Sequence, residues 1–188
     1  MSARIITSGH PINLDNTLPA RLNAPSPGSE YGIQSTVVAQ TVLFTEDATS
    51  TTHTGSVIIP AGSILLDIIV QSTALWTDSS ATLKVGDSVD DDGWFTGVEL
   101  DATDLLVGEK LQASSDNFWG GKNGVYLTTA GRFGTTTGAG IGGTYTSAGI
   151  VTGVVSVSTP SGTAGRTYMT VIYAPSLESR CLINATTA

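Results

Sequence analysis

Residues 63–74 read SILLDIIVQSTA, and this stretch decides the fold class. Two sets of residues alternate along it: Leu66, Ile68 and Val70 in one set, Asp67, Ile69 and Gln71 in the other. Successive side chains of a strand point to opposite faces of its sheet. The alternation therefore predicts a β-strand whose Leu66, Ile68 and Val70 side chains face a core.

Similar runs recur along the chain between turn-forming residues. They are rich in Val, Ile, Thr and Tyr, which favour strands, and Pro60-Ala61-Gly62 forms a turn before residue 63. The further predicted strands are Thr36–Thr45, Gly55–Pro60, Ala81–Val85, Val98–Leu100, Val125–Thr129, Val154–Ser158 and Thr167–Ala174. Eight short strands separated by turns indicate an all-β antiparallel sandwich or barrel. A short helix is expected only at Ala102–Leu111.

The first 34 residues differ in character from the rest. Residues 7–34 hold four of the seven prolines, and proline interrupts both helices and sheet ladders. We interpret residues 1–34 as an extended arm that orders against a partner, and residues 35–188 as the β-domain. Residues 131–150 are glycine-rich and predict a long hairpin or a loop on a neighbouring subunit. The expected interface residues are apolar: Ile12, Leu14, Leu18, Leu22, Phe133 and Ile141.

Charge and cysteine content exclude several classes of protein. Sixteen acidic and eight basic residues give a net charge of −8, which disfavours nucleic acid and anionic membranes as partners. Cys181 is the sole cysteine and is interpreted as a core residue, so no intrachain disulfide is possible. The N-terminal residues lack the apolar segment of a signal peptide, and we expect the protein to be made and folded in the cytoplasm.

No motif predicts catalysis or cofactor binding. Gly138–Gly143 (GAGIGG) formally matches the dinucleotide fingerprint, but threonine-rich segments flank it where a strand and a helix are needed. His10 and His53 lie far apart in the sequence, and no nucleophile elbow or HExxH motif is present. We therefore expect that the protein is not an enzyme and that it holds no cofactor.

Residues 85–109 contain eight acids and no lysine or arginine. The run Asp90-Asp91-Asp92-Gly93 resembles part of a calcium-binding loop, because adjacent carboxylates on a turn supply oxygen ligands. The spaced ligands and flanking helices of an EF-hand are missing. We expect a solvated acidic turn without metal, with Asp90, Asp91 and Asp92 as the ligands if Ca²⁺ binds.

Three tryptophans, Trp76, Trp94 and Trp119, lie in or beside predicted loops. Exposed tryptophans stack on sugars or anchor interfaces. Because tryptophan is usually largely buried, we expect all three to cap the ends of the β-core.

The segment from Gly55 to Leu111 resembles a family of tailed-bacteriophage virion proteins. The resemblance lies in residues 57–70 (VIIPAGSILLDIIV), in a strand ending at Lys84-Val85-Gly86 and in the turn Asp91-Asp92-Gly93-Trp94. A glycine-rich hairpin and a final strand like Tyr168–Ala174 extend it over residues 36–175. The resemblance implies a jelly-roll-like β-domain at the virion surface.

The resemblance does not fix the position in the virion, and our leading hypothesis is a capsid decoration (cement) protein on the outer face of the head, bridging major capsid protein subunits. We expect a homotrimer that fits the local threefold symmetry of a capsid. Two alternatives remain open. One is a head-fibre or tail-associated adsorption module that binds host glycans, which an exposed Trp76 or Trp119 would favour. The other is a virion-associated hydrolase, which would need a convergent pair of carboxylates.

Overall fold

The computed structural model describes residues 4–7, 10–13, 37–78, 80–101, 104–114, 121–128 and 141–176. The chain divides into two units, Met1–Ser35 and Thr36–Ala188. In the first unit, strands β1 (Arg4–Thr7) and β2 (His10–Asn13) pair antiparallel, with Ile5 opposite Ile12. Ile12 is therefore part of a hairpin, while Leu14, Leu18, Leu22 and Phe133 lie outside the described residues.

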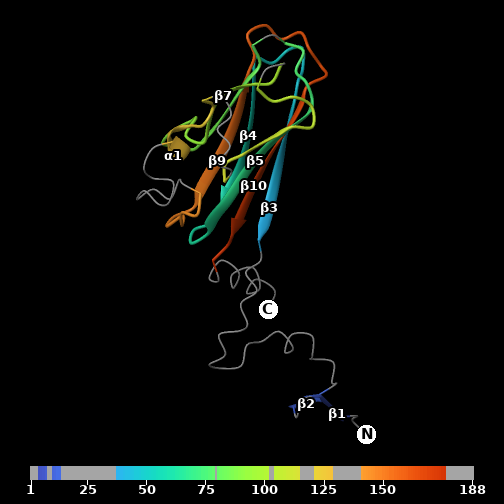
Figure 1. Ribbon diagram of the computed structural model, residues 1–188, viewed down its shortest axis with the longest axis vertical. Coiled ribbons are helices and arrows are strands. Elements are labelled where there is room, and N and C mark those ends of the chain that lie inside the picture. Colours follow the sequence, from blue (N-terminus) through green and yellow to red (C-terminus); the bar gives the residue numbers. More distant parts are fainter. Residues whose placement is uncertain are drawn as a thin grey trace. The chain divides into compact units, whose positions relative to one another are not determined.

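The second unit is a sandwich of two antiparallel four-stranded sheets (Figure 1). One sheet has the order β3-β10-β5-β8 and the other the order β4-β9-β6-β7. The strands are β3 (Val38–Thr45), β4 (Thr52–Ile59), β5 (Ile64–Ala74), β6 (Thr82–Gly86), β7 (Phe95–Glu99), β8 (Lys110–Gln112), β9 (Gly149–Ser156) and β10 (Arg166–Ala174). The all-β antiparallel sandwich that the sequence predicts is confirmed.

The pairing of these eight strands is nested. The first strand, β3, pairs with the last, β10; β4 pairs with β9, β5 with β8 and β6 with β7. The domain is thus one long antiparallel hairpin that is folded back on itself, and successive strands from β3 to β6 alternate between the sheets.

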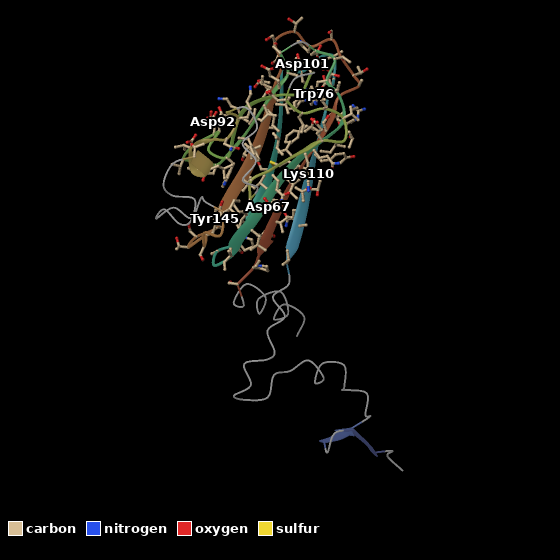
Figure 2. The ribbon with its side chains drawn as sticks, viewed as in Figure 1. Asp67, Trp76, Asp92, Asp101, Lys110 and Tyr145 are labelled. Atoms are coloured by element: carbon tan, nitrogen blue, oxygen red, sulfur yellow. The ribbon has the colours of Figure 1, made fainter. Side chains whose placement is uncertain are left out.

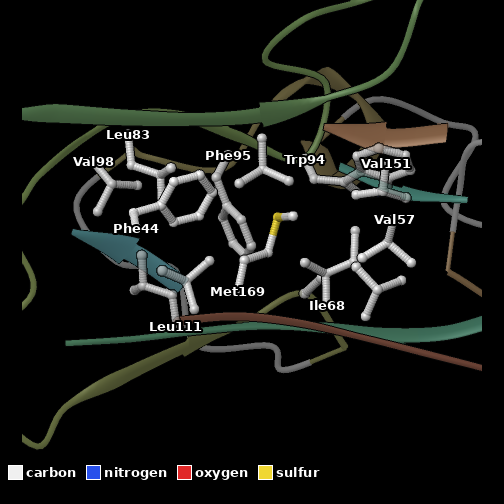
Figure 3. Close-up of a cluster of buried hydrophobic side chains, with 14 of the residues drawn as sticks. Phe44, Val57, Ile68, Leu83, Trp94, Phe95, Val98, Leu111, Val151 and Met169 are labelled. Carbon is white, nitrogen blue, oxygen red and sulfur yellow. The ribbon is translucent and has the colours of Figure 1, made fainter. Parts of the chain in front are cut away.

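The core lies between the two sheets, and Figure 3 shows part of it. Every second residue of β10 points inward, so that Thr167, Met169, Val171 and Tyr173 are all buried. Met169, Val171 and Tyr173 belong to one hydrophobic cluster with Val57, Leu83 and Val151 of the other sheet, and Figure 3 labels Met169 within that cluster. Each fully buried aliphatic side chain contributes about 1.5–3 kcal/mol, so the inward-facing residues of both sheets hold the sandwich together.

The predicted inward face of β5 is wrong at Leu66. Leu65 is buried and Leu66 is only half-buried, whereas Ile68 and Val70 face the core as expected. The cause is a register shift: Ile172 of β10 lies opposite Asp67, but the next residue, Tyr173, lies opposite Leu65. An extra residue in β5 forms a bulge, which reverses the alternation of side chains on its N-terminal side.

The predicted strand Val125–Thr129 is also wrong. Residues Val125–Thr128 form a single helical turn, α1. The carbonyl of Gly124 accepts hydrogen bonds from the N–H groups of Leu127 (3.0 Å) and Thr128 (3.2 Å), which closes the turn. The β-favouring composition is overridden by this local bonding and by packing of Tyr126 on Trp94.

In the described ranges, no helix is long and apolar enough to cross a membrane.

The expected helix at Ala102–Leu111 does not form where the chain is described. Residues 104–108 make turns, and Lys110 begins β8. Gly108 adopts a left-handed φ of 84°, which ends any right-handed helix there. The Asp104 carboxylate accepts the N–H of Glu99, and the Glu109 carboxylate accepts the N–H of Leu106. Asp104 and Glu109 therefore stabilise turns in this segment by accepting backbone hydrogen bonds.

Candidate functional site

The acidic turn between β6 and β7 is the first candidate site (Figure 2). Its first carboxylate, Asp87 Oδ1, accepts the N–H groups of Val89 at 2.8 Å and Asp90 at 3.0 Å, and the hydroxyl of Tyr126 at 3.0 Å. Side-chain acceptance of this kind stabilises tight turns. A Cβ atom at Gly86 would collide with the backbone of Asp90. The absence of a side chain at Gly86 therefore lets the turn fold back on the end of β6.

Asp90, Asp91 and Asp92 converge, because one carboxylate oxygen from each lies within 4.8 Å of the others. A hydrogen bond with Asp92 raises the pKa of Asp90, whereas the hydroxyl of Thr96, 2.6 Å from Asp92 Oδ2, lowers the pKa of Asp92. Lys84 Nζ lies 3.4 Å from Asp91 Oδ2. The three oxygens form part of a ligand set for a hard cation, which takes six to eight. That these residues bind no Ca²⁺ remains a prediction.

The tryptophans were the candidates for sugar binding. Trp76 is 1% exposed and Trp94 is 0% exposed. The indole N–H of Trp76 donates to the hydroxyl of Thr167 at 3.0 Å, and the ring packs edge-on against His53. The expected burial is confirmed for Trp76 and Trp94, and Trp119 lies outside the described residues. Trp76 cannot stack on a glycan in this conformation.

Sequence reasoning missed Glu46, a carboxylate that is 2% exposed just after β3. Its Oε1 accepts the N–H groups of Thr77 and Asp78, both at 2.8 Å. Its Oε2 accepts the N–H groups of Ala164 at 3.0 Å and Gly165 at 2.8 Å, and the Thr77 hydroxyl at 3.1 Å. Five donors on one carboxylate tie the loop after β5 and the loop before β10 to the end of β3.

Asp78 extends this network. Its Oδ1 accepts the N–H and the hydroxyl of Ser161, at 2.8 Å and 2.7 Å, and the N–H of Gly162 at 3.0 Å. The hydroxyl of Ser161 is the main cause that lowers the pKa of Asp78. The carboxylates of Glu46 and Asp78 thus both accept hydrogen bonds from backbone N–H groups of the loops. No sequence motif marks them, because Glu46 and Gly165 lie 119 positions apart.

Asp67 acts in a similar way at the bulge of β5 (Figure 2). Its Oδ1 accepts the N–H of Ile68 at 2.9 Å and the N–H of Ser114 at 3.0 Å. Its Oδ2 accepts the side-chain amide of Gln112 at 2.6 Å and the hydroxyl of Ser114 at 2.9 Å. Asp67 therefore satisfies the backbone that the bulge exposes and fastens the short strand β8 to the sheet edge.

The described interface candidates divide into two groups. Ile141, predicted from sequence, is 8% exposed and belongs to the hydrophobic core of its own chain. Ile58 and Ile150, which sequence reasoning did not select, are 63% and 48% exposed. They are register partners on β4 and β9 and form an apolar pair on the outer face of the sheet. The sequence predicts a strand at Ile58 but places Ile150 in the glycine-rich segment, so it does not show that the two residues pair.

Comparisons with known proteins give structural likeness only. No family model matches the chain, and no curated protein does either. A chain of the cyanophage Pam1 capsid asymmetric unit is similar, with 19% identity, a TM-score of 0.45, and 84% of this chain and 96% of that chain covered. A chain of the capsid of Ralstonia phage GP4 is 15% identical, with a TM-score of 0.42, and 81% of this chain and 90% of that chain covered.

Proposed function

We propose that this chain is a structural component of a bacteriophage virion, a capsid decoration protein that bridges major capsid subunits on the outer surface of the head. The observation that carries the proposal is the resemblance of residues 55–111 to tailed-phage virion proteins. The quoted motifs coincide with structural elements: residues 57–70 build β4, the turn and β5, and the Asp-Asp-Gly-Trp turn leads into β7. The antiparallel sandwich of two four-stranded sheets supports the proposal, because the resemblance implies an all-β domain.

The mechanism is passive. A protein that binds the assembled shell but not free subunits shifts the assembly equilibrium toward the shell, by an amount that grows with its concentration relative to Kd. The acids of the second unit suit such a role, because Glu46, Asp67 and Asp78 rigidify loops and edges. A rigid module loses little conformational entropy when it binds, which favours affinity.

Two parts of the chain are assigned to contacts. One is the arm, residues 1–34, whose spaced Ile and Leu side chains cannot form a core alone. The other is the exposed pair Ile58 and Ile150. A stable interface of standard size needs about 800 Å² from each partner, and each well-buried Ile or Leu contributes about 1.5–3 kcal/mol.

Copy number tests the position in the virion. Densitometry of purified virions on a gel should show hundreds of copies relative to the major capsid protein. A handful of copies per virion would contradict the decoration role and favour a tail component. Light scattering on the purified protein, and on the protein released from capsids, tests the predicted trimer. A monomer in both samples would contradict that assignment.

Removal of the arm separates folding from binding. A variant lacking residues 1–34 should give a β-rich circular dichroism spectrum, because the sandwich strands begin at Val38. It should co-sediment poorly with undecorated heads, because the apolar contacts of the arm are lost. Full binding by this variant would exclude the arm from the interface, and loss of the β spectrum would show that the arm is part of the fold.

A matched pair of substitutions tests the apolar pair. Ile58→Lys and Thr54→Lys place the same charge at exposed positions of β4, four residues apart and on the same face. Ile58→Lys should weaken head binding about 10-fold or more, since it removes about 1.5–3 kcal/mol of apolar burial. Thr54→Lys should bind nearly as the wild type does. Equal losses in both variants would indicate an electrostatic effect of the sheet face.

A further inference from the structure

Residues 121–128, which include α1, lie along the edge of β7, and we call them the clasp. Three backbone hydrogen bonds of 2.8–2.9 Å join the clasp to residues 93–96, with the N–H groups of Thr96, Gly124 and Tyr126 donating to the carbonyls of Lys122, Trp94 and Gly93 respectively. Phe95 has Val85 of β6 on one side and Asn123 of the clasp on the other. Because β7 is the last strand of its sheet, the clasp occupies the position where a further strand would pair.

Two glycines make this close approach possible. A Cβ atom at Gly93 would collide with the ring of Tyr126, and a Cβ atom at Gly124 would collide with the backbone of Asp92. The ring of Tyr126 also packs edge-on against Trp94, with the ring centroids 5.2 Å apart. The absence of side chains at both glycines indicates that the clasp is fitted to this edge of the sheet.

Two polar side chains of the clasp add contacts outside the backbone ladder. Lys122 Nζ donates to the carbonyl of Gly97 at 2.8 Å and lies 2.9 Å from Asp104 Oδ2. The hydroxyl of Tyr126 donates to Asp87 Oδ1 at 3.0 Å, which connects the clasp to the acidic turn. Both members of the ion pair between Lys122 and Asp104 are partly exposed, so dissolved salt screens their attraction.

The clasp contributes little to the hydrophobic core. Among its eight residues only Gly124, which has no side chain, is buried, while Tyr126 and Leu127 are partly buried against the core. Residues 141–145 differ, because Ile141 and Tyr145 are buried. Release of the clasp would therefore break hydrogen bonds and one ion pair without opening a cavity in the core. Segments with few buried apolar contacts are the ones that open while the rest of a protein stays folded.

We propose that the clasp is a detachable guard of the β7 edge: residues 121–128 leave the sheet as a unit while both sheets of the sandwich stay folded. The closed clasp pairs with the N–H of Thr96 and the carbonyl of Trp94. Covering an edge is one way in which β-proteins prevent pairing with other chains. The open state presents these two groups and uncovers the side of Trp94 on which Tyr126 packs. This inference concerns the isolated protein and does not depend on capsid binding.

Hydrogen exchange of the full-length protein, resolved by residue with NMR, tests the proposal. The backbone N–H groups of Thr96, Gly124 and Tyr126 bond across the clasp, so one opening event should expose all three. We expect them to share one protection factor, about 100-fold or more below that of N–H groups in β9 and β10. Protection equal to that of β9 and β10 would show that the clasp opens only on global unfolding and would overturn the proposal. Three unrelated protection factors would show fraying of single residues, which would overturn it equally.

Lys122→Met tests the polar contacts of the clasp with little change in side-chain size. It removes the donor to Gly97 and the ion pair with Asp104, so the three N–H groups should exchange about 3- to 10-fold faster. Exchange in β9 and β10 should not change. The matched control is Lys110→Met, which removes the same charge from an exposed position on β8. Equal acceleration by both substitutions, or acceleration that extends to β9 and β10, would contradict a clasp that opens by itself.

Discussion

The carboxylate of Glu46 makes the sharpest prediction about stability. Glu46→Gln keeps the size of the side chain but replaces one acceptor oxygen with an NH₂ group. Each oxygen of Glu46 accepts one buried N–H, that of Asp78 on Oε1 and that of Gly165 on Oε2. Whichever way the amide turns, one buried donor and at least one partly buried donor lose their acceptor.

A buried donor left unpaired costs about 1–3 kcal/mol. With the partly buried donor added, Glu46→Gln should lower the free energy of unfolding by about 2–4 kcal/mol. For a domain of this size, about 3 kcal/mol corresponds to a decrease in Tm of roughly 6–12 °C. The matched control is Glu109→Gln, where one exposed hydrogen bond, to Leu106, is affected; it should change stability by less than about 0.5 kcal/mol.

Urea unfolding followed by tryptophan fluorescence measures both variants, since the buried Trp76 and Trp94 report on the core. The wild-type and variant m-values should agree, so that midpoints can be compared directly. If Glu46→Gln is as stable as Glu109→Gln, the hydrogen bonds of Glu46 do not hold the loops together and the reasoning fails.

Three further predictions concern pH, packing and metal. Hydrogen bonds from Ser161 lower the pKa of Asp78 in the folded protein. The contribution of Asp78 to folding stability is therefore present above the unfolded-state pKa of about 4 and is lost as pH falls through the folded-state pKa. Asp78→Asn should reduce the loss of stability at acidic pH, and an unchanged acid dependence would contradict this. A Cβ at position 55 would collide with Val42 Cγ1, so Gly55→Ala should lower the free energy of unfolding by about 1–3 kcal/mol. The decrease should be smaller in a Val42→Ala background. Strictly additive effects of the two substitutions in chemical denaturation would show that the two side chains do not meet. EDTA should leave Tm unchanged, because no Ca²⁺ is expected at Asp90–Asp92; a decrease of several degrees that Ca²⁺ reverses would show a metal site.

The strands could be predicted from the sequence wherever local preference and tertiary environment agree. In β10, the alternation of Thr167, Met169, Val171 and Tyr173 matches their burial because the strand runs between two partners without a bulge of its own. In β5 the alternation fails at Leu66, since a bulge depends on the register with a strand about a hundred residues away. At residues 125–128, β-favouring residues form a helical turn because Gly124 offers its carbonyl there.

The candidate site was harder to predict than the fold. The acidic turn at Asp87–Asp92 is visible because its residues are adjacent in sequence. Glu46 is not, since its partners are contributed by two loops that the sandwich brings together. An isolated acid after a strand gives no local signal of a buried acceptor. The exposed pair Ile58 and Ile150 depends in the same way on cross-strand register.

The nested pairing of strands also sets the order in which the chain can fold during synthesis. Before residue 149 has been made, only the β6–β7 and β5–β8 pairs of the sandwich can form. Among the strands that the structure describes, β3 pairs only with β10 and β4 only with β9, so both must wait until the last quarter of the chain emerges. Pairings between residues so distant in sequence slow folding. While the chain waits, the uncharged edge of β3 is open to other nascent chains, and ribosomes translating one message hold such chains close together.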